Sequence, residues 1–196
     1  MVPISRTSDA LVAPVTTTEL AGWGRFEATD PILQPLLDSS TAIVLENIKR
    51  DLITRNWNLT YWDWPTEDNQ PKVQLNQKFN ALATEIRLPY TAINTTVTQV
   101  LIDGELADAA DYTLREDALY FEYIAITNDE TVKALEVEYT AGYGATAADV
   151  PKAIKDAIKT LATHFYYHRG CDAMSALQNS GAAFMLEPYR KAESLV

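Results

Sequence analysis

The segment near position 140 constrains the fold more than any other part of this chain, because its residue pattern changes there from that of a strand to that of a helix. Leu135, Val137 and Tyr139 alternate with glutamates, which is the period-two pattern of a strand with one buried and one solvated face. Gly142 and Gly144 follow and end the strand. The sequence therefore predicts a half-buried strand that leads through a glycine-containing turn into a helix.

The predicted helix starts close to Val150. Asp149 is the expected N-cap, and Pro151 lies near the first helical position, where its missing N–H group costs nothing. The apolar stripe of this helix consists of Ile154, Ile158, Leu161 and Phe165. Its far side carries a basic ridge that ends in a tyrosine, made of Lys152, Lys155, Lys159 and Tyr166. We interpret this ridge either as a solvated face or as a dock for an acidic surface of a neighbouring subunit.

An earlier long helix is predicted from Asp30 to Ile53, with apolar residues over an arc wider than one sheet contact requires. We expect it to be buried on two sides, either within its own domain or by a neighbouring subunit. The next segment, Asn56–Trp64, is typical of a strand rich in large rings, with Trp57, Tyr61, Trp62 and Trp64. Proteins that stack nucleic-acid bases on aromatic rings place those rings beside basic grooves, and here the nearest charged residues are Arg55 and Asp63. The aromatic residues are therefore expected to pack in the core or at a subunit interface.

Further strands are predicted at Ala83–Leu88, Thr96–Ile102, Tyr112–Leu114, Leu119–Tyr123 and Val132–Tyr139, with a hairpin turn at Asp103-Gly104. The fold class is therefore α+β: a long N-terminal helix, an antiparallel β-sheet region, a long C-terminal helix and an extended C-terminal tail. We divide the chain into an N-terminal arm (1–29), a single α+β domain (30–170) and a C-terminal docking tail (171–196).

The net charge of −11 argues against a protein that grips nucleic acid by neutralising phosphates. Eleven acids against Arg115 and Lys133 give −9 between Leu101 and Thr140, so the excess lies on the predicted strands. This is the pattern either of a solvated sheet or of a channel wall along which DNA slides. The N-terminus lacks the pattern of a signal peptide and no segment is apolar enough to span a membrane, so we expect a soluble, unsecreted protein.

Catalytic and metal-binding patterns are weak. His164, His168 and Asp172 are spaced four apart, but they lack the glutamate of a His-Glu-x-x-His site, and Gly170 should end the helix before Asp172. A single Cys171 excludes an internal disulfide and a multi-cysteine zinc site. No nucleophile motif or phosphate-binding loop occurs. We expect no catalytic residues, no metal and no cofactor, although a carboxylate pair in an acidic cleft remains an alternative.

The C-terminal tail is too apolar to be free in solvent, since it contains Phe184, Met185, Leu186 and Tyr189. We expect it to dock onto this chain or onto a partner. Deleting Phe184–Val196 is predicted to abolish docking to the partner while the domain still folds.

The strand-to-helix junction, followed by a helix ending in His164–Arg169, resembles head–tail connector proteins. These are the adaptors of tailed double-stranded DNA bacteriophages and gene-transfer particles. The opening Leu11–Thr16, the helix that feeds the strand around Trp57, and Val100–Gly104 with Asp111–Leu114 after it are similar to that family in order.

The resemblance implies a structural virion protein, assembled in the host cytoplasm and located in the neck. It would form a homo-oligomeric ring, expected to have twelve subunits, beneath the portal protein. The ring would extend the DNA channel without binding DNA specifically and would join the capsid to the next neck or tail protein. Another neck component, such as a stopper or tail-completion protein, is the alternative.

In this family the C-terminal segment reaches the portal protein. The resemblance thus places the portal interface at Phe184, Met185, Leu186, Tyr189 and Arg190. The predicted subunit interface comprises Lys152, Lys155, Lys159, Tyr166, Trp57 and Trp62.

Overall fold

The structure is a computed structural model that describes residues 4–8, 12–62, 84–115, 118–121 and 134–191. Contacts divide the chain into two compact units. The β unit takes in Arg55–Gly142 together with the N-terminal residues up to Asp9, and the helical unit takes in Ala10–Thr54 and Tyr143–Glu193. The predicted domain at 30–170 therefore includes parts of both units. The α+β class and the antiparallel sheets are confirmed.

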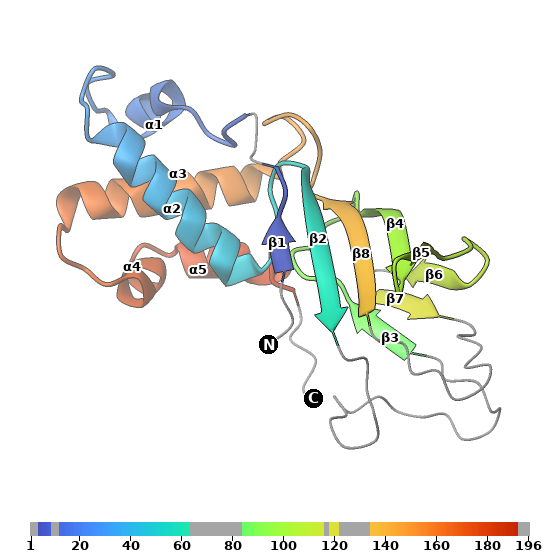
Figure 1. Cartoon of the computed structure of the whole chain (residues 1–196). Coiled ribbons are helices and arrows are strands. Elements are labelled where there is room, and N and C mark those ends of the chain that lie inside the picture. Colours follow the sequence, from blue (N-terminus) through green and yellow to red (C-terminus); the bar gives the residue numbers. More distant parts are fainter. Residues whose placement is uncertain (1–3, 9–11, 63–83, 116–117, 122–133, 192–196) are drawn as a thin grey trace. The chain divides into compact units, whose positions relative to one another are not determined.

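A five-stranded antiparallel sheet forms the larger part of the β unit (Figure 1). Its order is β1 (Ile4–Arg6), β2 (Arg55–Trp62), β8 (Ala134–Ala141), β4 (Thr96–Ile102) and β5 (Glu105–Leu106). β2 and β8 pair over their whole length, from Arg55 opposite Ala141 to Trp62 opposite Ala134. β4 and β5 form the hairpin predicted at Asp103-Gly104, where both residues have positive φ.

A second sheet of three antiparallel strands has the order β3 (Thr84–Arg87), β7 (Ala118–Phe121) and β6 (Tyr112–Arg115). Both sheets contribute to one apolar core, whose buried members include Trp57, Leu59, Ile86, Leu88, Val100, Leu119, Leu135, Val137 and Tyr139. The alternation predicted for β8 is confirmed, because Leu135, Val137 and Tyr139 are buried while Glu138 is exposed. The predicted loop at Pro65–Gln77 lies outside the described residues.

Helices make up the other unit: α1 (Thr17–Gly24), α2 (Leu33–Ile48), α3 (Lys152–Tyr167), α4 (Ala173–Asn179), α5 (Ala182–Leu186) and the 3-10 turn η1 (Glu187–Tyr189). α3 buries the stripe Ile154, Ala157, Ile158 and Leu161, whose spacing places these side chains on one face. α2 packs against α1, α3 and α5 (Figure 1). Leu33, Leu37, Val44 and Ile48 are buried by these contacts, whereas Ile32 and Ile43, which widen the apolar arc, are only half-buried.

α2 is shorter than the helix predicted at 30–53. It ends at Ile48, because Lys49 adopts a left-handed conformation (φ 55°) in which its N–H group donates to the Leu45 carbonyl. Leu52 and Ile53 continue the apolar pattern and are buried, but they lie beyond the helix end. The helical spacing of the sequence thus extends into a segment that is buried without being helical.

The start of α3 also differs from the prediction. The N-cap is Pro151, and Asp149 instead accepts hydrogen bonds at 2.8 Å from the N–H and the hydroxyl of Thr146. Gly144 is required here, since a Cβ at this position would lie 2.4 Å from the Asp149 carboxyl carbon. Asp149 therefore stabilises the turn before the helix.

The predicted extended tail is wrong for the described residues after Gly170. They fold into α4, α5 and η1, because Ala176, Leu177, Ala182 and Leu186 provide enough apolar surface to pack. α5 packs against α3, and Leu186 is fully buried. This segment is part of the core of the helical unit.

Candidate assembly surfaces

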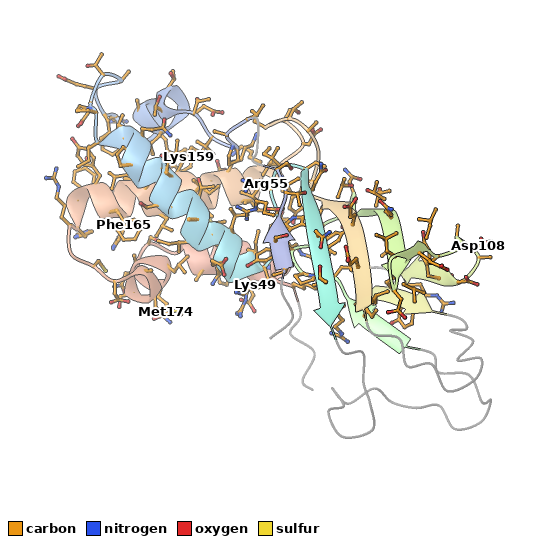
Figure 2. The ribbon with its side chains drawn as sticks, viewed as in Figure 1. Lys49, Arg55, Asp108, Lys159, Phe165 and Met174 are labelled. Carbon is orange, nitrogen blue, oxygen red and sulfur yellow. The ribbon has the colours of Figure 1, made fainter. Side chains whose placement is uncertain are left out.

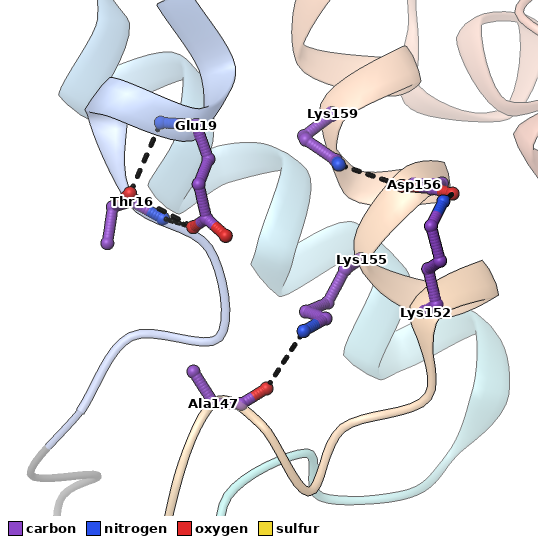
Figure 3. A network of polar contacts seen from close by, with 7 residues as sticks. All are labelled: Thr16, Glu19, Ala147, Lys152, Lys155, Asp156 and Lys159. Atoms are coloured by element: carbon purple, nitrogen blue, oxygen red, sulfur yellow. Dashed lines mark hydrogen bonds and ion pairs between the residues drawn. The ribbon is translucent and has the colours of Figure 1, made fainter. Parts of the chain in front are cut away.

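The lysines of the predicted basic ridge are engaged within the helical unit (Figure 3). Asp156 forms ion pairs with Lys152 and, at 2.7 Å, with Lys159. The Lys159 ammonium also lies 4.4 Å from the centre of the Trp23 ring on α1. Lys155 donates a hydrogen bond of 3.1 Å to the Ala147 carbonyl. Only Lys152, whose side chain is 81% exposed, extends well into solvent.

Neighbouring carboxylates offset the charge of this ridge. Burial raises the pKa of Asp156, but hydrogen bonds from Lys152 and Lys159 outweigh it and hold that pKa below its usual value. The pKa of Glu19 is lowered by the Thr16 backbone N–H, which donates to it at 2.7 Å, and further by the charges of the nearby lysines. The ridge is therefore a nearly neutral network rather than a free basic surface.

Tyr166 fastens the connection between α1 and α2 onto α3. Its hydroxyl donates to the Asp30 carboxylate at 3.0 Å, and its ring stacks on Phe26 with centroids 4.2 Å apart. Phe26 in turn covers Gly24, where a Cβ would lie 2.1 Å from the ring. The pKa of Tyr166 is raised, chiefly by the hydrogen bond to Asp30. These contacts give Tyr166 a role inside the helical unit.

Trp57 of the aromatic strand β2 packs inside the β unit. Trp57 is buried in the core of the β unit, and its ring stacks on Tyr90 with centroids 4.6 Å apart and planes 7° apart. The Arg6 guanidinium lies 4.9 Å from the same ring. Trp57 is therefore covered by residues of its own unit. The side chain of Trp62, the other predicted tryptophan, lies outside the described part of the chain.

The C-terminal segment presents an apolar surface beside a buried anchor. Phe184 is 88% exposed and Met185 is 38% exposed, whereas Leu186 is fully buried. Two hydrogen bonds fix the chain after α5: Arg50 Nε donates to the Tyr189 carbonyl at 3.0 Å, and the Lys191 N–H donates to the Ile48 carbonyl at 2.9 Å. Of the five residues predicted to contact the portal, Leu186 serves the core instead.

Sequence reasoning missed another strongly exposed apolar residue, Ile93, which lies on a turn of the β unit and is 84% exposed. One signal was present in the sequence: residues 88–102 contain no charged side chain. By contrast, exposed acids follow the same strand at the hairpin and beyond, at Asp103, Glu105, Asp108 and Asp111. Figure 2 shows Asp108 at the β5 and β6 end of this unit.

The formal charge is unevenly divided between the two units. Sixteen acids and seven bases give the β unit −9, whereas eleven acids and nine bases give the helical unit −2. The acidic excess that the sequence placed on the strand region therefore coincides with one compact unit. A net negative charge of this size repels DNA phosphates.

The histidine pair lies at the end of α3, with ring centroids 4.5 Å apart. Burial, followed by the nearby His168, lowers the pKa of His164. Asp172 does not join them, since its carboxylate accepts a hydrogen bond from the Ser175 N–H at 2.9 Å and caps α4. Within the described residues, no cluster of three or more His, Cys, Asp or Glu side chains is arranged to hold a metal ion.

Membrane-spanning helices are absent from the described part of the chain. None of its helices combines the length and the apolar character needed to cross a bilayer.

The sequence matches no family profile and no curated protein. Solved structures, however, contain chains of similar fold. One, from the virion of the native gene transfer agent (GTA) particle, is 18% identical, with 98% of this chain and 97% of that chain covered and a TM-score of 0.66.

Two others, with the same coverage and 19% identity, come from the neck of the empty GTA particle computed with C6 symmetry and the neck of the native GTA particle computed with C12 symmetry. Their TM-scores are 0.64 and 0.65. These likenesses confirm the predicted resemblance at the level of the fold.

Proposed function

We propose that this chain is a structural, non-enzymatic subunit of a virion neck: a head–tail adaptor that forms a ring of twelve copies beneath a portal protein. The likeness of fold over 98% of the chain to chains in GTA virion and neck structures is the observation that carries this proposal. Because the likeness extends over both units, it supports a similar use of the whole chain. In this role the ring extends the DNA channel and joins the capsid to the next neck or tail protein.

The charge distribution supports the channel part of the proposal. A conduit must let the duplex slide, and a wall that neutralises phosphates would hold it instead. The β unit has a formal charge of −9, and its exposed acids include Asp103, Glu105, Asp108, Asp111 and Glu138. We assign the lining of the channel to this unit, with no specific binding of DNA.

We assign the portal contact to the exposed side of the C-terminal segment. Phe184 and Met185 provide apolar area there, and Arg190 adds an exposed charge. Tyr189 is half-buried and lies where Arg50 fixes the backbone, so it can flank the contact. Leu186 is left out because its burial in the helical unit makes it unavailable to a partner. The contact therefore uses a preformed surface, which lowers the ordering cost of binding.

The subunit contacts need a similar revision. Lys155, Lys159 and Tyr166 are held by groups of their own helical unit, and Trp57 by its own β unit. Lys152 keeps a largely exposed side chain and remains our candidate from the ridge for a contact with a neighbouring copy.

The test is to mix the purified chain with the portal protein of the same particle and to image the product by electron microscopy. A ring of this chain stacked coaxially on the portal supports the adaptor assignment. A persistent monomer that ignores the portal overturns it. A ring that attaches only beneath another neck protein would instead assign the alternative role of stopper or tail-completion protein, since likeness to neck structures fits those roles too.

A point variant locates the portal contact. Phe184→Asp should reduce stacking on the portal about tenfold or more, because burial of an aromatic side chain contributes roughly 1.5–3 kcal/mol. Met174→Asp is the matched control, since Met174 is also an exposed apolar residue of the helical unit but lies on α4 (Figure 2). Equal stacking by Phe184→Asp and the unaltered chain would place the portal contact elsewhere.

A further inference from the structure

The turn formed by residues 88–95, which we call the Ile93 turn, is held firmly against the β unit. Leu88 is fully buried, and the Tyr139 hydroxyl donates a 2.9 Å hydrogen bond to the Pro89 carbonyl. Thr91 and Ala92 are buried as well. A turn anchored in this way keeps one shape, so the position of its exposed residues is determined by the core beneath it.

Tyr90 adopts a backbone conformation that costs energy. Its φ of 55° lies in the left-handed region, where a bulky residue is strained by about 1–3 kcal/mol. The flat stacking of its ring on Trp57, which also contacts Arg6, compensates for this cost. The buried tryptophan of β2 therefore supports the Ile93 turn. Strain of this kind persists where the surrounding structure requires one particular geometry.

Ile93 projects from the tip of this turn into solvent. The Thr95 hydroxyl closes the tip, since it accepts from the Ala92 N–H at 3.1 Å and donates to the Ala92 carbonyl at 2.9 Å. Ile93 itself is 84% exposed, directly after two buried residues. Its β-branched side chain has few rotamers, so little entropy is lost when it enters an apolar contact.

The chain segment that contains Ile93 is free of charged residues, although it belongs to a strongly acidic unit. Residues 88–102 contain no Asp, Glu, Lys or Arg, although the β unit has a formal charge of −9. Asn94, Thr96 and Thr98 are the exposed neighbours along the chain. Two copies with the same negative charge approach each other at least cost where neither presents an acid. A basic partner would favour the acidic parts of the unit instead.

We propose that the Ile93 turn is a contact between neighbouring copies of this chain, with Ile93 inserted into an apolar surface of the next copy. This inference rests on the proposed ring and specifies one of its subunit interfaces. It also gives Trp57 a role at that interface: Trp57 positions the turn and does not touch the neighbour.

Photo-crosslinking tests the identity of the occupant. Ile93 is replaced by p-benzoylphenylalanine, and the variant is irradiated during assembly of the full chain with the portal protein. Cross-linked products with the mass of two or more copies of this chain support the proposal. Cross-links to the portal alone, or no cross-link in rings that form normally, overturn it while the adaptor role stands. If the unaltered chain forms no ring with the portal protein, both proposals fail.

A pair of variants measures the contribution of the contact. Ile93→Asp should lower ring yield about tenfold or more, because it replaces an apolar contact by a charge that repels the acidic neighbour. Leu106→Asp is the control, since Leu106 is 71% exposed in the same unit but lies on β5. Circular dichroism of both monomers should match that of the unaltered chain. Equal ring yields for the two variants would contradict a specific role for Ile93.

Discussion

The two units support their exposed apolar residues in different ways. In the β unit, Ile93 stands on a turn held by one tyrosine hydroxyl and by stacked aromatic rings. In the helical unit, Phe184 stands on α5, whose other side is held by Leu186 in an aliphatic core. The first support depends on directional polar contacts, and the second depends on burial. Substitutions should therefore affect the two surfaces by different mechanisms and to different degrees.

The two units also differ in charge. The helical unit balances its lysines against Asp156 and Glu19, whereas the β unit keeps an excess of nine acids. A turn without charged residues therefore stands out in the acidic β unit. An apolar helix face does not stand out in the helical unit, whose net charge is small. Because of this contrast, we assign the contact between neighbouring copies of this chain to the Ile93 turn. We assign the contact with the portal protein to the surface around Phe184.

The largest effect should come from Leu186→Ala. Leu186 is fully buried, and loss of such a side chain costs about 2–5 kcal/mol in the free energy of unfolding. Met185→Ala, at the adjacent and partly exposed position, should cost under about 1 kcal/mol. Denaturant unfolding of both variants checks the comparison. Similar stabilities would mean that the C-terminal segment is not part of the core.

The same reasoning revises the predicted deletion of Phe184–Val196. This deletion removes Leu186 together with the hydrogen bonds that join Tyr189 and Lys191 to the α2 region. We therefore expect the truncated chain to lose stability rather than to fold unchanged, and point variants are the sounder test of docking.

An intermediate effect is expected in the β unit from Tyr139→Phe. The variant keeps the ring in the core but removes the hydrogen bond to the Pro89 carbonyl, at a cost of about 0.5–1.5 kcal/mol. Because that bond also holds the Ile93 turn, ring yield should fall with stability. Tyr120→Phe is the control, since Tyr120 is half-buried in the second sheet. Unchanged unfolding and unchanged ring yield would show that the turn needs no such support.

The smallest effect concerns pH and the helical unit. The pKa of His164 is lowered from 6.5 by burial and then by His168, so the unfolded chain takes up this proton more readily than the folded chain. Stability should therefore be complete above about pH 6.5 and should decline as pH falls through this value toward the lower, folded pKa. His164→Gln should flatten this dependence, measured by thermal unfolding between about pH 8 and pH 5.5.

His168→Gln is the comparison for that experiment. It removes only the second cause of the shift, so its pH dependence should remain closer to that of the unaltered chain. If His164→Gln retains the full slope, another group is responsible for the proton uptake.

Local patterns predicted most of the elements correctly. Alternation in β8 and the period of α3 follow directly from which residues share a face, so their burial was readable from Leu135, Val137 and Ile154 onward. The hairpin at Asp103-Gly104 followed from two residues that tolerate positive φ. The resemblance in the order of elements likewise carried over to the fold.

Side-chain partners were beyond such patterns. Lys155 and Lys159 looked free along α3, but Ala147 and Trp23 meet them from positions that no spacing rule identifies. Asp156 is different, because it lies three residues before Lys159 on the same helix, a spacing that predicts an ion pair. Leu186 looked like a docking residue because its apolar character is the same whether its own chain or a partner covers it. Contacts between residues far apart in the sequence decide whether such a side chain is covered by its own chain or left exposed to a partner.

The sequence by itself determined the α+β class, the strand-to-helix junction and the acidic character of the strand region, because these depend on periodicity, turn residues and charge counts. Only the tertiary structure decided which apolar and charged side chains remain exposed. Burial depends on what the rest of the chain brings into contact, and here it covered Trp57 and Leu186 and left Ile93 and Phe184 in solvent.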